Sequence, residues 1–332
     1  MNVKRSEIPI QSGNRSKEYI FNREIQSRLA GFTASLQKLG HKENTIRQKQ
    51  NYAGYFLNWL ETERMQADEA RYNDMLNFID YCTLENKSKK QVNSMLGAIR
   101  NYYEYLKETN PEITNPAANL YLKGITRKLP ANIIDYRELE KLYREYQTAT
   151  NRDKRNKVML GLLIYQGLTT GELHELKAEN LQLEQGKIII PGNRKRNSRT
   201  LELKPFQILE LYEYVNKIRP KIVKEISKPK PARKPNKINK KKLKEQLFIS
   251  INGSEHIKNS LLHMFRKIRK TNPEIKNAKQ VRAGVIAHWL KTHNLRQVQY
   301  FAGHKYVSST ERYLLDNLDK LQSKLEKYHP LK

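Results

Sequence analysis

The sequence predicts a mainly α-helical protein of two domains with one small antiparallel β-sheet. Apolar residues recur at helical spacing through most of the 332-residue chain. A basic connector at 122–130, which ends in proline, separates two halves that are each long enough to bury a core. Two β-type runs, 186–191 and 199–203, flank a basic tip and therefore predict a hairpin in the second half.

The first half predicts a helical bundle after a disordered N-terminus at 1–17, which is polar and without periodicity. Four segments carry apolar residues three or four positions apart, so that each can bury one face. They run over 18–39, then from a cap at Asn44 or Thr45 to Leu60, then over 72–84, and lastly over 88–107. We therefore expect the first domain to span 18–130.

The second half, 131–332, predicts a helical domain around the hairpin. The expected elements are a helix at 136–146 capped by Asp135, a helix at 158–166 that ends at Gly167, strands at 181–184 and 247–251, and a helix at 257–268. Residues 219–246 are rich in Lys, Arg and Pro and poor in apolar residues. This composition predicts a flexible basic insertion.

The charge of the chain predicts a polyanionic partner. Lys and Arg total 63 against 34 Asp and Glu, a formal net charge of +29, and each phosphate that such a protein neutralises releases a counterion. A single cysteine, Cys82, excludes an intramolecular disulfide and a cysteine-based zinc site. Without a long apolar run or a signal peptide, we expect a cytoplasmic protein with no membrane span.

Residues 279–313 hold an ordered set of chemically useful side chains. Lys279 and Arg282 are three apart, which brings them to one side of a helix. A second helix, 295–301, is expected to end at Gly303, where a positive φ is easily adopted, with His304 directly after it. Ser308, Ser309 or Thr310 could cap a third helix that carries Tyr313. Two cations, an imidazole and a phenol would then meet at one place.

This order resembles the tyrosine recombinases, also called the phage integrase family. The family pattern reads here as Lys279-Gln-Val-Arg282, then Phe301-Ala302-Gly303-His304, then Tyr313 nine residues beyond His304. The segment from Gly167 to Leu173 also matches the family motif Gly-Leu-Arg-x-x-Glu-Leu, except that Thr169 stands at the position of the arginine.

The resemblance implies a helical core-binding (SAM-like) domain followed by a catalytic domain, which together clamp a DNA duplex. It implies a site-specific recombinase or integrase of a mobile element, which cuts and rejoins DNA through a 3′-phosphotyrosyl intermediate without cofactor, metal or ATP. Tyr313 would be the nucleophile, Arg282 would hold the phosphate, His304 would donate to the phosphate or assist Tyr313, and Lys279 would support them. Lys195, at the hairpin tip, would be the acid for the leaving 5′-oxygen.

Two points of the alignment leave alternatives open. Arg194 and Arg196 flank Lys195, so an offset of one residue on the hairpin is easily made. At Thr169, losing a charged donor of this kind costs about 10²–10³ in rate in comparable sites. Either another cation replaces it, or the enzyme is slow or inactive. The candidates are Arg194, Arg196, Arg137 and Lys279.

DNA contacts and oligomerisation are further expectations. Phosphate contacts are expected from the hairpin and from the fourth segment of the first domain, at Arg194, Arg196, Lys87, Lys89, Lys90 and Arg100. The leucine-rich segment 314–332 predicts a terminal helix, which in the family packs into a neighbouring protomer. Its alternative role is to cover its own domain. The resemblance implies a homo-tetramer on two DNA sites.

Three other functions compete with the recombinase interpretation. A catalytically impaired DNA-binding relative would keep the fold but form no covalent adduct. A type IB topoisomerase would share the constellation and relax plasmids irrespective of sequence. A generic RNA-binding protein would share the charge but leave the motif spacing unexplained.

Overall fold

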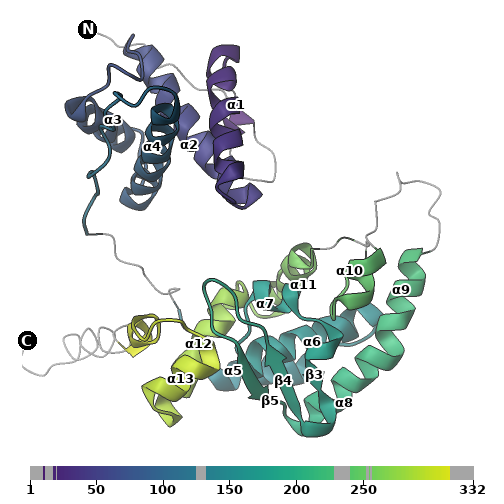
Figure 1. The fold of residues 1–332 in the computed structure, drawn as a ribbon. Helices are drawn as coiled ribbons and strands as arrows, with labels where there is room; N and C mark the ends of the chain where they lie inside the picture. The colour runs from purple at the N-terminus through teal and green to yellow at the C-terminus, as the bar shows by residue number, and fades with distance from the viewer. Residues whose placement is uncertain are drawn as a thin grey trace, which may run out of the picture. The chain divides into compact units, whose positions relative to one another are not determined.

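The computed structural model describes residues 10–11, 18–19, 21–124, 132–227, 240–251, 254 and 256–314. Contacts divide the chain into two compact units, Met1–Arg127 and Lys128–Lys332, which are treated separately here (Figure 1). Helices make up most of both units, and the second unit holds a three-stranded antiparallel sheet. The predicted mainly α fold with a small antiparallel sheet is confirmed. None of the described helices is long and apolar enough to cross a membrane.

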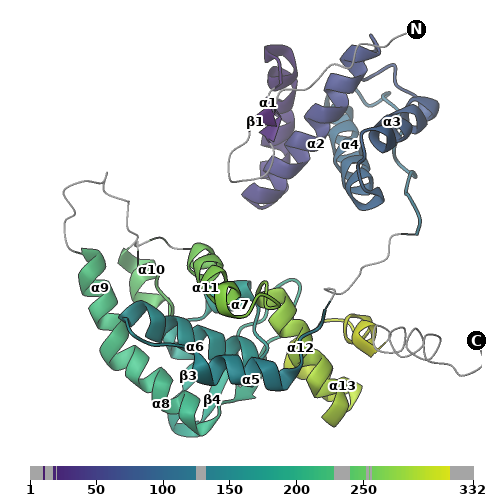
Figure 2. The same ribbon diagram turned by 180° about the vertical axis from the view of Figure 1, so that it is seen from behind.

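The first unit is a bundle of four helices, seen from two sides in Figure 1 and Figure 2. These are α1 (Arg23–Lys38), α2 (Glu43–Thr62), α3 (Tyr72–Leu84) and α4 (Lys89–Thr109). Ser88 caps α4 with its hydroxyl. The predicted cap of α2 at Asn44 or Thr45 is wrong, because the cap position is Lys42, two or three residues earlier, and its side chain makes no capping hydrogen bond.

Aromatic side chains fill the core of the first unit. Phe56 and Phe78 are fully buried and meet edge to face at 5.2 Å between ring centroids, and Trp59 packs on Phe78 at 5.3 Å. Most of the N-terminal stretch 1–17 lies outside the described residues. Its described part, β1 (Ile10–Gln11), pairs antiparallel with β2 (Glu18–Tyr19), so it is not wholly without structure.

The second unit is built around α6, whose residues Met159, Leu160 and Leu163 are fully buried. This helix begins at Asn151, seven residues before the predicted start, because the Thr150 side chain caps it. The described helices of the second unit are α5 (Tyr136–Glu145), α6 (Asn151–Tyr165), α7 (Thr170–Glu175), α8 (Pro205–Glu213), α9 (Arg219–Ser227), α10 (Lys240–Glu245), α11 (Lys258–Thr271), α12 (Ala278–Thr292) and α13 (Leu295–Ala302), with a further helical stretch at 308–314.

The sheet of the second unit has the order β3-β4-β5, all antiparallel. Its strands are β3 (Leu181–Gln182), β4 (Lys187–Ile190) and β5 (Arg199–Glu202), with short 3-10 turns at Ala178–Asn180 and Leu183–Gln185. Strands β4 and β5 form the predicted hairpin, in which Ile190 faces Arg199 and Ile188 faces Leu201.

The predicted strand at 247–251 is wrong. The segment is buried, but its carbonyls bond to side chains rather than to a strand. Tyr214 donates its hydroxyl to the Leu247 carbonyl at 3.0 Å, and Arg155 donates to the Ile249 carbonyl at 2.7 Å. Side chains therefore supply the partners that a strand would have supplied.

The predicted flexible insertion at 219–246 is helical at both ends. A π-helical turn, Tyr214–Ile218, joins α8 to α9, so that the two form one long helix in Figure 1. Ile222 and Ile226 are buried, and the Arg219 guanidinium donates to carbonyls near the end of α10. Only 228–239 lies outside the described residues. The predicted terminal helix at 314–332 also lies there, except for its first residue.

Candidate active site

Arg282 lies at the centre of the site. It is placed by α12, and its side chain points inward, with only 5% of the residue exposed. Its Nη1 donates to the Gly167 carbonyl and its Nη2 donates to the Ala302 carbonyl at 2.5 Å. Burial lowers the pKa of this guanidinium to about 9, so it remains charged at neutral pH.

Lys279 lies one turn before Arg282 but is exposed, with no side-chain bond to a described residue. The two cations are three residues apart, as the pattern required, yet one enters the core and the other faces solvent.

His304 is held between Arg282 and the helical stretch at 308–314. Gly303 ends α13 with φ +63, the left-handed conformation expected there, and this turn brings His304 Nε2 to 3.2 Å from Arg282 Nη2. Because a guanidinium only donates, Nε2 accepts, and Nδ1 carries the proton that it shares with Thr310 Oγ1 at 2.9 Å. Burial, followed by the charge of Arg282, lowers the pKa of the imidazole to about 3.

The cap of the third helix expected at Ser308, Ser309 or Thr310 is wrong, and Thr310 holds the His304 ring instead. The helix starts earlier, where the carbonyl of Val307 accepts from the backbone N–H groups of Thr310 and Glu311. The Thr310 side chain is fully buried and fixes the orientation of the His304 ring.

Tyr313 is half-buried and lies next to His304. The two rings are nearly parallel, with an interplanar angle of 18° and centroids 6.2 Å apart, and the phenol packs on a small apolar cluster that includes Ile286 and Val298. Burial raises the pKa of the Tyr313 hydroxyl, while the positive charges of Arg282 and Arg196 act in the opposite direction. Arg282, His304 and Tyr313, separated along the chain, are thus brought together.

Thr169 stands at the start of α7 and serves as its cap. Its hydroxyl and its backbone N–H both donate to Glu172 Oε2 at 2.8 Å, and the hydroxyl in turn accepts from the Glu172 N–H. The other carboxylate oxygen of Glu172 accepts from Arg199 Nη1 at 2.7 Å, in an ion pair whose two side chains are almost completely buried. The threonine is therefore part of a helix start.

Arg199, Arg196 and Arg282 surround Glu172 with positive charge. Hydrogen bonding to Arg199 and its charge outweigh the opposing effect of burial and lower the pKa of Glu172 to about 2. This carboxylate stays ionised at any pH at which the protein would work.

The hairpin tip separates its three basic residues. Asn193 and Arg196 exchange backbone hydrogen bonds of 2.8 and 3.1 Å, which makes Arg194 and Lys195 the outer residues of a tight turn. Both of these are exposed. Arg196 turns inward, forms an isolated antiparallel bridge with His304, and brings its Nη1 to 4.0 Å from Glu172 Oε1. Of the three, Arg196 is the residue that enters the cluster.

The basic residues predicted in the first unit lie around the start of α4. Lys89 and Lys90 are exposed in its first turn, and the Lys87 amine lies over the Tyr55 ring at 5.0 Å. Arg100 is more constrained, because its Nη1 donates to the Leu120 carbonyl at 2.8 Å.

Sequence reasoning did not select Glu172, Arg199 or Thr310 as site residues. Arg199 carried a usable signal: it alternates with Leu201 and Leu203 along the strand, so its side chain had to face the buried side of the sheet. A charge in that series requires a buried partner.

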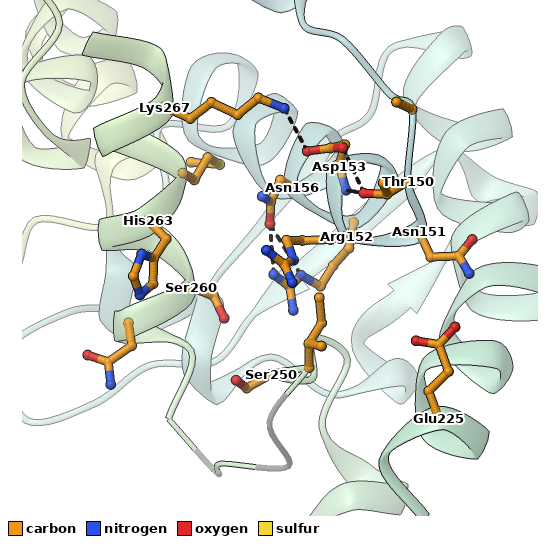
Figure 3. Close-up of a pocket in the computed structure, with 15 residues that line it drawn as sticks. Thr150, Asn151, Arg152, Asp153, Asn156, Glu225, Ser250, Ser260, His263 and Lys267 are labelled. Atoms are coloured by element: carbon orange, nitrogen blue, oxygen red, sulfur yellow. Dashed lines mark hydrogen bonds and ion pairs between the residues drawn. The ribbon is translucent and has the colours of Figure 1, made fainter. Parts of the chain in front are cut away.

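A large polar cleft elsewhere in the second unit contains none of the predicted site residues (Figure 3). It lies between the start of α6, α9 and α11. Lys267 pairs with Asp153 at 3.0 Å, and Arg155 bonds to Asn156 and to the backbone, so these charged groups are used internally. In the described part of the chain, no three His, Cys, Asp or Glu residues gather to hold a metal ion.

The chain is similar along most of its length to known recombinases. It is 24% identical over 299 residues to the tyrosine recombinase XerD of Listeria innocua, which covers 88% of this chain and 94% of the relative. It is 25% identical over 277 residues to the tyrosine recombinase XerC of Natranaerobius thermophilus, which covers 81% of this chain and 86% of the relative.

Solved structures of recombinases share the fold. XerH bound to its palindromic difH substrate superposes with a TM-score of 0.60 at 21% identity and covers 81% of this chain and 75% of that chain. The Tn1549 transposon integrase in complex with transposon right-end DNA superposes with a TM-score of 0.59 at 14% identity. The match covers 91% of this chain and 99% of the integrase chain. Residues 132–319 match the model of the phage integrase family. This match spans more than half of the chain and includes every residue of the cluster, and we conclude that the chain belongs to the phage integrase family, the tyrosine recombinases.

Proposed function

We propose that this protein is a site-specific DNA recombinase, the integrase or transposase of a mobile element, that acts through a covalent phosphotyrosyl intermediate. The observation that carries the proposal is the convergence of Arg282, His304 and Tyr313 in one partly buried cluster. The transposon and Xer recombinases that share its fold were solved on DNA, which supports duplex DNA as the substrate.

In the proposed first step, Tyr313 attacks the scissile phosphorus. A bond forms between its Oη and phosphorus as the bond from phosphorus to the 5′-oxygen breaks, so the energy of the phosphodiester is retained. The Tyr313 proton passes to solvent as the bond forms, and the nearby charges of Arg282 and Arg196 favour the phenolate. His304 is neutral, its low pKa makes it a weak base, and its Nε2 already accepts from Arg282, so we propose that it assists Tyr313 by holding Arg282 in place. The fixed guanidinium of Arg282 neutralises the non-bridging oxygens, and because carbonyls already hold it, little reorganisation is needed.

The leaving 5′-oxygen needs a proton. Lys195 remains the proposed acid, since its amine is exposed at the tip of a turn that is joined to His304 through Arg196. DNA that reaches Arg282 would therefore lie close to this tip. A 5′-hydroxyl of the partner strand then attacks the same phosphorus, loses its proton and releases Tyr313, which regains one.

Recombination requires two DNA sites, so we propose that four protomers assemble on them. The leucine-rich segment after Leu314 is the proposed contact between neighbours. The first unit would bind the duplex through Lys87, Lys89, Lys90 and Arg100.

The test is covalent trapping on nicked duplexes of randomised sequence. Cleavage close to the nick releases a short fragment and leaves the protein linked to DNA, which is measured on a denaturing gel. We expect an adduct with the wild type and none with Tyr313→Phe. If the wild type formed no adduct with any sequence in the pool, the impaired DNA-binding relative, which the threonine at 169 favours, would replace this proposal. Relaxation of plasmids irrespective of sequence would instead indicate a topoisomerase.

A further inference from the structure

The site lacks one cation, and Thr169 does not replace it. The Thr169 hydroxyl is already bonded to Glu172 at 2.8 Å and begins α7. A threonine carries no charge, so beside Arg282 a second positive group is needed to balance the charge that develops on the phosphate oxygens.

Arg199 is the nearest buried cation to Glu172 but is not free to serve. Its Nη1 donates to the carboxylate of Glu172, and its Nε and Nη2 have no hydrogen-bond partner among the described residues. Its side chain has no exposed surface, however, so a phosphate cannot reach these two nitrogens. The backbone at Gly303 also lies against it, since a Cβ at that position would come within 2.4 Å of Arg199 Nη1. Arg199 is a positioning residue that neutralises Glu172 from inside the protein.

Arg196 is only loosely paired. Its Nη1 lies 4.0 Å from Glu172 Oε1, close enough for an ion pair but beyond hydrogen-bond distance, and both oxygens of Glu172 are already hydrogen-bonded. This nitrogen is buried yet has no hydrogen-bond partner among the described residues. Its side chain is 27% exposed, so the guanidinium reaches both the cluster and solvent. A buried donor without an acceptor is costly, and an incoming phosphate oxygen would satisfy it.

The charge of Arg196 acts on Arg282, His304 and Tyr313. After burial it is the next cause that lowers the pKa of Arg282, after burial and Arg282 it lowers the pKa of His304, and it opposes the rise that burial causes in the pKa of the Tyr313 hydroxyl. The other candidate replacements, Arg194, Arg137 and Lys279, are all exposed, and none of them is among the main causes of these shifts.

We propose that Arg196 is the second phosphate-holding cation of this site, reached from the hairpin instead of from position 169. This inference rests on the proposed function, because it assigns a role in the same cleavage step. The turn that exposes Arg194 and Lys195 at the tip directs Arg196 inward, and the bridge to His304 fixes it there. The hairpin would then supply both the acid and half of the phosphate clamp.

The primary experiment measures the rate of adduct formation on a nicked duplex selected with the wild type. We expect Arg196→Gln to lower this rate by about 10²–10³, the loss typical of one such donor, and Arg196→Lys to lose less because it keeps the charge. Lys187→Gln, which removes an exposed positive charge from β4 of the same hairpin, should stay close to the wild type. Thermal unfolding of each variant establishes that it is folded.

Two further measurements separate a phosphate contact from a structural role. The first uses a duplex whose scissile phosphate carries a methyl group in place of one non-bridging oxygen and is therefore uncharged. On it the defect of Arg196→Gln should shrink by tenfold or more. The second adds Thr169→Arg to Arg196→Gln, which places a cation at the position where the family pattern has one and should recover part of the rate.

The outcomes are distinct from those of the parent proposal. Normal adduct formation by Arg196→Gln would overturn the inference, and so would an equal defect on the charged and uncharged substrates, while the wild-type adduct and its loss in Tyr313→Phe would still stand. If Arg196→Gln fails to fold, Arg196→Lys is used instead. A folded lysine variant whose rate, relative to the wild type, is the same on the charged and uncharged substrates counts against a phosphate contact. Absence of any wild-type adduct would remove the proposed function itself.

Discussion

At the scale of single residues, Glu172 organises the site without facing the substrate. Its two oxygens bind the start of α7 through Thr169 and the hairpin through Arg199. A buried charge that loses its partner is strongly destabilising, more so than a surface pair, because the remaining charge is left in a medium of low polarity. Glu172 is therefore a point at which stability and site geometry are coupled.

We expect Glu172→Gln to lower the free energy of unfolding of the second unit by about 3 kcal/mol, since Arg199 would stay buried without a counter-charge. The folded-state pKa of Glu172 is about 2, below its ordinary value of 4.5. The stabilisation is thus complete above pH 4.5 and is lost as the pH falls towards 2. The measurement is urea unfolding of both proteins across this range, where their difference should be large at pH 7 and shrink in acid.

Glu179→Gln provides the matched control, because Glu179 is exposed and its partner Lys177 is 3.5 Å away at the surface. Surface pairs contribute little, so this variant should change the free energy of unfolding by less than about 1 kcal/mol. Equal effects of the two substitutions would contradict the central position given to Glu172.

At the scale of secondary structure, the turns carry the site. Asp135, Ser88 and Gly303 are where the sequence predicted helix ends, because cap chemistry is local and needs only a few residues. The strand expected at 247–251 and the flexible segment expected at 219–246 were wrong for the opposite reason. Their state depends on distant partners, namely Arg155, Tyr214 and Arg219, which no local pattern reveals.

The same distinction applies to the site. The order and spacing of Arg282, His304 and Tyr313 grouped three side chains that lie together in the structure. The same reasoning placed Lys279 with them, but Lys279 is exposed, because spacing along a helix does not decide which of its sides is buried. The inward turn of Arg196 was not predictable. It follows from the backbone hydrogen bonds at the tip, which decide which of the three adjacent basic residues points towards the cluster.

Gly303 offers an element-scale prediction with a close control. Gly303 and Gly186 share the same backbone conformation, φ +63 with ψ 31 and 30, so alanine adds the same left-handed strain of about 1–2 kcal/mol at each. At Gly303 the new Cβ would also lie 2.4 Å from Arg199 Nη1, whereas at Gly186 the nearest atom is 3.4 Å away, at the end of the Ile208 side chain.

We therefore expect Gly303→Ala to destabilise the second unit more than Gly186→Ala does, because Arg199 must move. For the same reason the rate of covalent adduct formation should be at least tenfold lower in Gly303→Ala than in Gly186→Ala. Unfolding curves and the trapping assay on both variants measure this. Similar adduct yields from the two would show that the turn tolerates displacement of Arg199.

At the scale of the whole molecule, the formal net charge of +29 governs encounter with DNA. Phosphate contacts release counterions, so affinity falls linearly with salt on a logarithmic plot. If the protein makes six or more such contacts, its affinity should fall by about 10³ or more between 50 and 200 mM salt. Fluorescence anisotropy with a labelled duplex measures the slope.

Replacing both Lys89 and Lys90 by glutamine should reduce that slope by about two, one for each lost phosphate contact. A double variant with the wild-type slope would place the DNA surface of the first unit elsewhere on its bundle.

The isolated bridge between Arg196 and His304, together with the hydrogen bond from the Asn197 N–H to the Gly303 carbonyl at 3.2 Å, has a mechanical consequence. These contacts join the hairpin tip, which would hold the DNA backbone, to the turn at Gly303 that leads towards Tyr313. A displacement of the turn at Gly303 and His304 would therefore displace the hairpin tip as well. The placement of Tyr313 and the position of the hairpin tip would then change together. A protomer whose Tyr313 is out of place would also hold its DNA strand less firmly.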